Sequence, residues 1–354
     1  MQKKQRATIQ NIADIVGVSK TTVSRYLNNK LKYMSAETKS KIEEAIKQTD
    51  FRPNRLANSL KTSKSGLIGL VLSDVTAALA PYIIGSVCTA CIKYEKKVIV
   101  INSNGDPNNE INLVKDLLDQ QVEGILVGSG YNHEFYYTLS REECPIVIMS
   151  RINLIENANY GIDSIYINHW ESASSVITHL ADKGFEKILL VTTPYRDAYS
   201  TFSTREKAAI STCKKIFGSE NHCEKVIIDQ PWLRAFSQRT DLNAYSYDSL
   251  SSMLLCHYEK SKKEKTALFV IATSLMGDLI CCCYQHNISF DDHFTVAGYD
   301  SYQFSRFAND KICVIEQPLM EMGQLATERL MQQIEAGGTL PIQQTVLRCK
   351  LTLQ

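Results

Sequence analysis

From Leu67 onward, short apolar runs alternate with longer amphipathic segments, and this alternation constrains the fold more than any other feature of the 354-residue chain. Roughly ten to twenty residues with helical spacing separate most of the runs, as in buried parallel strands joined by crossover helices. The runs are LIGLVL, KVIVIN, GILVG, PIVIM, KILLVT, KVIID, ALFVI and FTVAGY. They predict two similar α/β halves that divide near residues 162–166, with a ligand cleft between them at the carboxyl ends of the strands.

Composition places the chain among ordinary globular proteins, with 44% hydrophobic and 22% charged residues. No apolar run approaches the roughly 20 residues needed to span a bilayer. The first residues, MQKKQRATIQ, have neither the apolar core nor the cleavage site of a secretory signal. We therefore expect a cytoplasmic protein without a membrane partner.

The net charge of +1 conceals a division between two parts of the chain. Residues 1–65 contain 14 Lys and Arg against 5 Asp and Glu, a net of +9. The remaining residues contain 25 against 33, a net of −8. This asymmetry indicates a basic module that meets a polyanion, joined to an acidic body.

The basic segment has the caps and periodicity of short helices. Thr8 is expected to cap a first helix, Ser19 a second and Ser35 a third. Gly17 follows the first helix, where a left-handed conformation is favoured. With Ala13 and Val23, it has the spacing of a helix-turn-helix.

The second helix, in the stretch GVSKTTVSRYLNN, carries side chains suited to DNA. Hydroxyl and amide groups bond phosphates, and arginine pairs bidentately with guanine. We therefore interpret this helix as one that reads the major groove. The residues expected to point outward or toward the groove are Lys20, Thr21, Thr22, Ser24, Arg25 and Asn28.

The segments TIQNIADIVGVSKTTVSRYLN and FRPNRLANSLKTSKSGLIGLV closely resemble the DNA-binding headpiece, hinge helix and first core strand of the lac repressor family. The resemblance continues in HLADKGFEKILLV, VAGYD and VIEQPLMEMGQLATERL, and so covers nearly the whole chain. Within the family, VSKTTVSRYLNNKLKYMSAET looks most like a Gram-positive branch linked to ketodeoxygluconate and other sugar acids.

The resemblance implies an all-α helix-turn-helix headpiece followed by a periplasmic-binding-protein-like α/β core of two parallel-sheet subdomains. The expected domains are a helix-turn-helix at 1–50, a hinge helix and linker at 51–65, and an effector-binding core at 66–354. Within the core, the N-subdomain is expected at 66–162 and 318–340, and the C-subdomain at 163–317 and 341–354.

The resemblance also assigns DNA contacts. Lys20, Thr21 and Arg25 stand at the family's base-reading positions. Leu60 matches the hinge leucine that wedges into the minor groove at the centre of a palindromic operator, where unstacking a base step kinks the DNA. Thr8, Ser19, Asn54 and Lys61 complete the set of expected DNA-binding residues.

For the effector, the resemblance points to Arg205 in STREKAA and Asp300 after VAGY, because a donating Arg and an accepting Asp can hold a polyhydroxylated ligand. Several cleft positions depart from the family pattern: Ala77–Ala80 replace an aromatic turn, Thr273 and Ser274 stand where many members have Asn and Asp, and Asn168 and His169 replace the usual Asp and Asn after the first crossover. The remaining expected effector contacts are Asp74, Ser129, Trp232 and Thr273.

No catalytic motif, phosphate-binding loop or zinc-ligand spacing is present, so no enzyme activity, metal or cofactor is expected. The eleven scattered cysteines indicate free thiols in a reducing compartment. The sequence thus predicts a homodimeric repressor of carbohydrate use, whose partners are double-stranded palindromic operator DNA and a small sugar acid or sugar. Two alternatives remain open: a regulator with a partner protein or phosphorylated metabolite as corepressor, and a sugar-binding protein.

Overall fold

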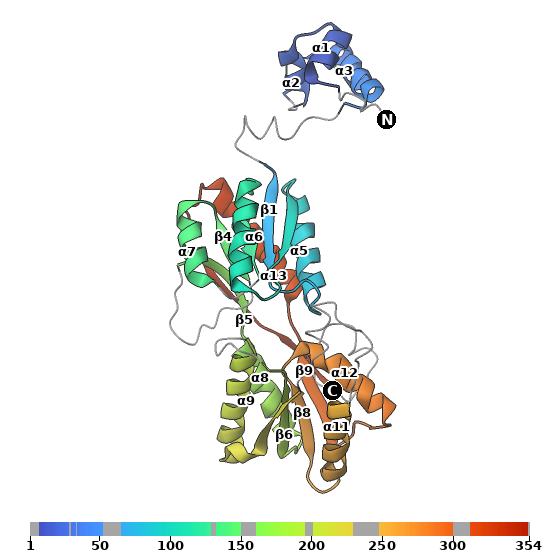
Figure 1. Ribbon diagram of the computed structural model, residues 1–354, viewed down its shortest axis with the longest axis vertical. Helices are drawn as coiled ribbons and strands as arrows, with labels where there is room; N and C mark the ends of the chain where they lie inside the picture. Colours follow the sequence, from blue (N-terminus) through green and yellow to red (C-terminus); the bar gives the residue numbers. More distant parts are fainter. Residues whose placement is uncertain are drawn as a thin grey trace. The chain divides into compact units, whose positions relative to one another are not determined.

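The computed structural model describes residues 7–27, 30–32, 34–51, 65–128, 132–149, 161–194, 201–228, 248–299 and 312–352. The chain forms two compact units, residues 1–65 and residues 66–354 (Figure 1). No helix in these described ranges is both long and apolar enough to cross a membrane.

The first unit contains three helices, α1 (Ile9–Val16), α2 (Lys20–Leu27) and α3 (Ala36–Thr49). The hydroxyl of Thr8 accepts the Asn11 amide at the start of α1, as its sequence position predicts. Ser19 and Ser35 accept amides of α2 and α3 in the same way, so the three predicted caps are confirmed.

The helices of this unit enclose a small apolar core. Ala13 of α1 and Val23 of α2 are buried against each other's helices and against Ile42 of α3. Gly17 ends α1 with a φ of 72°, in the left-handed region that a glycine adopts without strain. The predicted helix-turn-helix geometry is therefore present. The predicted hinge helix at Asn54–Leu60 lies outside the described residues.

The second unit is built on two six-stranded sheets. The first has the order β11-β5-β4-β3-β1-β2, and all its pairs are parallel, with Leu70 opposite Val100 and Leu126. Its strands are β1 (Leu67–Leu72), β2 (Lys97–Asn102), β3 (Ile125–Val127), β4 (Ile146–Met149), β5 (Asp163–Ile167) and β11 (Gln344–Leu347).

The second sheet has the order β12-β10-β9-β8-β6-β7, in which only the edge strand β12 is antiparallel. Its strands are β6 (Lys187–Thr192), β7 (Cys223–Ile227), β8 (Thr266–Val270), β9 (Phe294–Tyr299), β10 (Ile312–Glu316) and β12 (Lys350–Thr352).

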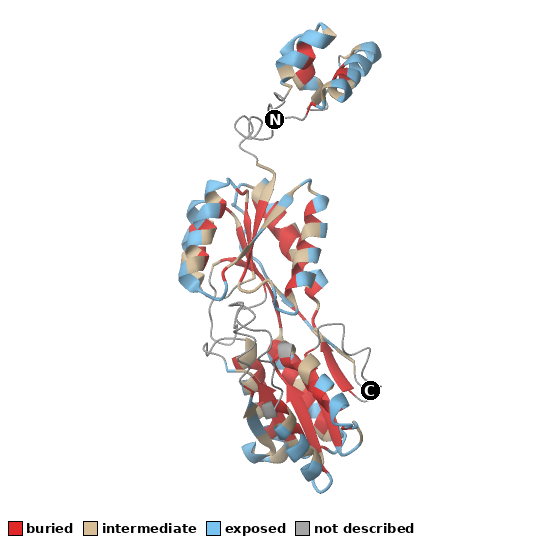
Figure 2. Ribbon diagram, turned by 45° about the vertical axis from the view of Figure 1, so that its right-hand side comes forward, coloured by how far each residue is buried: buried red, intermediate tan, exposed pale blue. Residues whose placement is uncertain are grey.

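Each sheet is covered by helices on both faces, because successive strand residues point to opposite sides. On the first sheet, α5 and α13 cover one face and α6 and α7 the other; on the second, α11 and α12 cover one face and α8 and α9 the other. Buried residues follow the strands and the inward helix faces (Figure 2).

The helices of the second unit have the following bounds: α5 (Ala80–Ile92), α6 (Pro107–Asp119), α7 (His133–Glu142), α8 (His169–Asp182), α9 (Thr201–Phe217), α11 (Asp248–Ser261), α12 (Thr273–Gln285) and α13 (Leu319–Glu335). A 3₁₀ turn spans Glu220–His222.

The predicted subdomain boundaries need a correction. Residues 163–167 form β5, and residues 344–347 form β11, which pair in the first sheet rather than belonging to the C-subdomain. The chain therefore crosses between the sheets at three places: between β5 and α8, between β10 and α13, and between β11 and β12.

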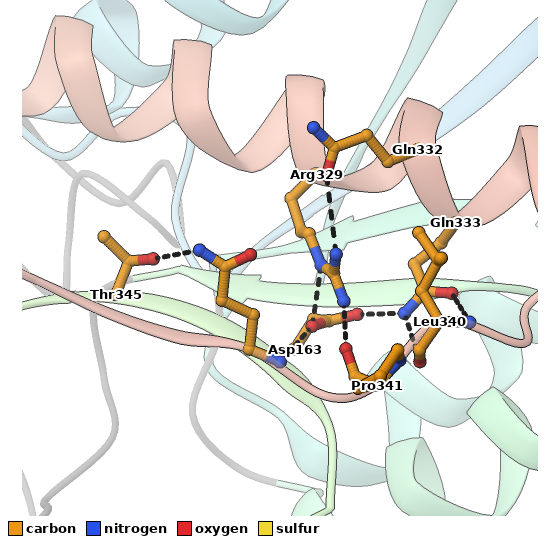
Figure 3. A network of polar contacts seen from close by, with 8 residues as sticks. Asp163, Arg329, Gln332, Gln333, Leu340, Pro341 and Thr345 are labelled. Carbon is orange, nitrogen blue, oxygen red and sulfur yellow. Dashed lines mark hydrogen bonds and ion pairs between the residues drawn. The ribbon is translucent and has the colours of Figure 1, made fainter.

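A buried polar network explains why β5 remains with the first sheet (Figure 3). The Asp163 carboxylate accepts hydrogen bonds from Arg329 Nε at 2.8 Å and from Gln333 Nε2 and the Gln343 amide, both at 2.6 Å. Arg329 and Gln333 lie on α13, and Gln343 precedes β11. These contacts satisfy a buried charge and fasten the start of β5 to two segments distant in sequence.

Gly66 is the first residue of the second unit and directly precedes β1. The Gly66 amide donates to Glu123 Oε1 at 2.6 Å, and Lys96 Nζ donates to Glu123 Oε2 at 2.5 Å. Both charged side chains are mostly buried. We call Gly66, Lys96 and Glu123 the junction clamp, because they hold the first residue of the second unit beside the first sheet.

Candidate functional site

The outer face of α2 presents the predicted base-reading side chains. Lys20, Thr21 and Arg25 are exposed, whereas Val23 faces the core and is fully buried. Tyr26 anchors the helix by donating its hydroxyl to Glu43 of α3 at 2.9 Å. The headpiece thus offers a rigid, basic helix face of the kind that enters a major groove.

Other predicted DNA contacts take part in capping. Ser19 Oγ accepts the Thr22 amide at 3.1 Å and lies 2.9 Å from Thr22 Oγ1, and Thr8 caps α1. Ser24 is half-buried on α2. The other four, Asn28, Asn54, Leu60 and Lys61, lie outside the described residues.

The second candidate site surrounds Arg205, on the inward side of α9. Its guanidinium is buried and donates from Nη1 to the Ile271 carbonyl at 2.6 Å and from Nη2 to Gln317 Oε1 at 3.2 Å. Nε and Nη2 also approach His169 Nδ1, at 3.4 and 3.3 Å. The guanidinium carbon lies 3.4 Å from the centre of the Tyr299 ring, a cation–π contact.

All of these groups lie at the carboxyl edge of the second sheet, where ligands of parallel α/β folds bind. Ile271, Tyr299 and Gln317 stand at the ends of β8, β9 and β10, and His169 is the first residue of α8. We call Arg205, His169, Tyr299 and Gln317 the arginine cluster.

The cluster is tied to the places where the chain crosses between the sheets. His169 begins the helix that follows the first crossing, and Gln317 lies in the second. Cys349 lies in the third crossing, where burial raises the pKa of its thiol to about 11 and the nearby Arg205 charge and Ser172 hydroxyl partly oppose this rise.

Burial determines the protonation of the cluster. Burial and then the Arg205 charge hold the pKa of His169 well below its ordinary value, so the imidazole is neutral near neutral pH. Burial raises the pKa of Tyr299 to about 12, and its hydroxyl lies 2.7 Å from that of Ser172. The cluster is thus a set of hydrogen-bonding groups around one permanent positive charge.

The structure describes two further predicted effector residues. Asp74, just after β1, uses Oδ1 to accept the amide and hydroxyl of Thr76 at 2.8 and 2.6 Å. Thr273 is the half-buried first residue of α12. The other three, Ser129, Trp232 and Asp300, lie outside the described residues.

His169, Tyr299 and Gln317 were not predicted from the sequence as site residues. Histidine at a helix start and tyrosine at a strand end have many structural uses, and Gln317 lies in the family-like EQP stretch without a charge to single it out. Only the packing around Arg205 brings them together.

A cavity of about 500 Å³ opens elsewhere in the second unit. It is lined by residues at the starts of β4 and β5 and at the end of α13, including Cys144, Gly161 and Gly338. It lies at the amino edge of the first sheet, the edge opposite the one at which α/β folds bind their ligands. In the described ranges, no group of three or more His, Cys, Asp and Glu side chains could hold a metal ion.

A helical headpiece with a basic reading helix, followed by an α/β core with two sheets, defines the class of protein as a DNA-binding regulator. Residues 8–54 match the model of bacterial regulatory proteins of the lacI family, and residues 177–353 match the periplasmic binding protein-like domain. The chain belongs to the lacI family of bacterial regulatory proteins.

Relatives and solved structures agree with this family. The chain is 25% identical over 345 residues to the HTH-type transcriptional regulator KdgR of Bacillus subtilis (strain 168), covering 96% of both chains. It is 26% identical over 361 residues to PtxS of Pseudomonas aeruginosa (strain PAO1), covering 100% of this chain and 96% of the relative.

The fold resembles that of the lac repressor dimer bound to operator and the anti-inducer ONPF, with a TM-score of 0.78 and 20% identity over 98% of both chains. It also resembles the transcriptional regulator CelR in complex with cellobiose, with a TM-score of 0.62 and 18% identity over 98% of this chain and 99% of the other. The protein is a DNA-binding transcriptional repressor and not an enzyme.

Proposed function

We propose that this repressor controls genes of carbohydrate use, and that a small sugar acid held at the arginine cluster releases it from its operator. The observation that carries the proposal is the Arg205 guanidinium, fixed by three acceptors at the carboxyl edge of the second sheet. A rigid guanidinium at such an edge suits a carboxylate, which accepts charge-assisted hydrogen bonds. The N-terminus of α8 begins beside it and adds a favourable field for an anion.

We propose further that the protein acts in the cytoplasm as a homodimer on a palindromic operator. Two copies of the basic headpiece would read two half-sites related by the two-fold axis of the dimer. The exposed Lys20, Thr21 and Arg25 on α2 support base reading, and Leu60 is proposed as the minor-groove wedge at the operator centre. Asp74, Ser129, Trp232, Thr273 and Asp300 remain proposed effector contacts.

The test begins with an operator selected in vitro from genomic fragments by the full-length protein. Fluorescence anisotropy then measures operator affinity as D-gluconate, D-galacturonate or 2-keto-3-deoxygluconate is added. Weaker operator binding with one acid, and no response to the matching neutral sugar, supports the proposal. Tighter binding with the acid indicates a corepressor instead, and no response to any acid contradicts a sugar-acid effector.

A further inference from the structure

His169 has one ring nitrogen that the arginine cluster uses and one that it does not. Its side chain is only 5% exposed, and Nδ1 lies 3.4 and 3.3 Å from Nε and Nη2 of Arg205. The other nitrogen, Nε2, is fully buried and has no hydrogen-bond partner in the part of the chain that the structure describes.

The contact with Arg205 fixes the tautomer of His169. A guanidinium can only donate hydrogen bonds, so Nδ1 must accept with a free lone pair. A neutral imidazole carries its single proton on the other nitrogen, so Nε2 is an N–H donor. A buried donor without an acceptor is costly and rare in native proteins.

We infer that the Nε2–H of His169 is a specificity-determining effector contact, which donates a hydrogen bond to an oxygen of the sugar acid bound beside Arg205. The inference rests on the proposed function. It extends that function because the charge of Arg205 recognises the carboxylate, whereas the neutral His169 donor requires an oxygen acceptor at a second point. A site built around such a donor discriminates strongly against a ligand that lacks the matching oxygen.

If His169 only held Arg205 in place, ligand binding would depend on its acceptor Nδ1 and not on its donor Nε2–H. Two variants distinguish these roles, because each keeps one of the two groups and removes the other. His169→Asn keeps an acceptor two bonds from Cβ, like Nδ1, and removes the distal donor. His169→Gln places an amide N–H donor three bonds from Cβ, like Nε2, and removes the proximal acceptor.

The experiment is calorimetric titration of full-length wild type and both variants with D-galacturonate, D-gluconate and 2-keto-3-deoxygluconate. D-galactose serves as the neutral partner of galacturonate. For the acid that binds the wild type, His169→Asn should weaken binding by about tenfold or more, the loss expected for a hydrogen bond between a donor and a charged or polar oxygen. His169→Gln should bind more tightly than His169→Asn.

Each other outcome has a separate meaning. Equal binding by wild type and His169→Asn, or weaker binding by His169→Gln than by His169→Asn, overturns the inference and leaves the proposed function standing. Flat titrations of the wild type with every acid contradict the proposed function and this inference with it. Independently of any ligand, ¹⁵N-resolved NMR of the His169 ring overturns the inference if the proton resides on Nδ1.

Discussion

At the scale of single residues, substitution of Arg25 tests directly whether α2 reads the bases of the operator. It lies on the outer face of α2, and its guanidinium can pair bidentately with one guanine in each half-site. We predict that Arg25→Ala costs about 1–3 kcal/mol of binding per half-site and relaxes base preference at one position. Anisotropy titrations with the operator and its single-base-pair variants measure both effects.

Lys41→Ala provides the control for Arg25. Lys41 is an equally charged, exposed residue of the headpiece, but it lies on α3 and pairs with Glu37. This substitution should leave base preference unchanged. If Arg25→Ala also leaves base preference unchanged, α2 does not read the operator through Arg25.

A second residue-scale prediction concerns acid stability. The folded-state pKa of His169 is depressed, so below an ordinary pKa of 6.5 the unfolded state binds a proton that the native state does not. The free energy of unfolding should therefore fall as pH drops below that value, by up to about 1.4 kcal/mol per pH unit from this group.

The matched comparison uses wild type and His169→Asn, unfolded in urea at about pH 7.5 and pH 5.5. The stability advantage of wild type over the variant should shrink at the lower pH. His179 and His257, whose pKa values are also lowered chiefly by burial, titrate in both proteins and cancel. An advantage that is independent of pH would show that His169 is not kept neutral in the native state.

Sequence reasoning reached Arg205 but not its surroundings. Arg205 could be located because a family motif places an arginine early in this helix. His169 is 36 residues away and Gln317 is 112 residues away along the chain, so their contacts with Arg205 depend on how two of the crossing segments meet α9. The sequence marks residues 168–169 only as a departure from the family pattern, and nothing local links them to Arg205.

At the scale of elements, most strands were predictable because their residues form continuous apolar runs, as in Leu67–Leu72 and Phe294–Tyr299. β5 was placed in the wrong sheet, since it begins with Asp163 and Ser164 rather than with an apolar pair. Arg329 and Gln333 compensate the buried charge of Asp163 from some 170 residues away along the chain. Local hydrophobic periodicity cannot reveal so distant a contact.

The pair α5 and α13 allows an element-scale prediction about close packing. A Cβ placed on Gly323 of α13 would lie 1.8 Å from Ser86 Oγ and 2.8 Å from Ser86 Cβ on α5. Gly323→Ala should therefore force the helices apart or push Ser86 from its place, and destabilise the core by about 1–3 kcal/mol. Thermal unfolding of the full-length protein measures the change.

Gly85→Ala is the control for Gly323. Gly85 lies in the interior of α5, and nothing approaches a Cβ there within 4 Å. Replacing it should stabilise the protein by about 0.5–1 kcal/mol, since glycine is a poor helix former. A destabilisation by both substitutions would argue against close contact as the cause at Gly323.

At the scale of the whole molecule, the charge division predicts how operator binding depends on salt. Residues 1–65 carry +9, and a dimer would present two such headpieces to the phosphates. The logarithm of affinity should fall with the logarithm of salt concentration by about 0.9 for each phosphate neutralised. Anisotropy titrations at increasing potassium chloride concentration give this slope, and a flat response would contradict electrostatic binding by residues 1–65.

The last prediction concerns how the arginine cluster communicates with the DNA. A ligand shifts a conformational equilibrium only by its difference in affinity between two states, typically about 1–3 kcal/mol. The cluster can sense such states because His169 and Gln317 belong to segments that cross between the sheets. Because the second unit begins at Gly66, a conformational change in the core must reach the headpiece through this residue.

The junction clamp is therefore the expected point of transmission. Glu123 fixes the Gly66 amide and Lys96 together, so motion of the first sheet moves the start of the linker. Glu123→Gln should loosen this attachment, leave acid binding at Arg205 unchanged, and reduce the factor by which the acid weakens operator binding. Calorimetry for the acid and anisotropy for the operator, with and without saturating acid, separate the two quantities.

Glu224→Gln is the matched control, because it removes the ion pair with Lys187 at 2.8 Å on the second sheet, away from the linker. It should preserve both acid binding and coupling. Equal coupling in wild type and Glu123→Gln would show that the ligand acts on the headpieces by a route other than the junction clamp. Loss of acid binding in Glu123→Gln would instead mean that the clamp supports the folded core as a whole, since Glu123 lies just before β3 of the first sheet and Arg205 lies on α9, which packs on the second sheet.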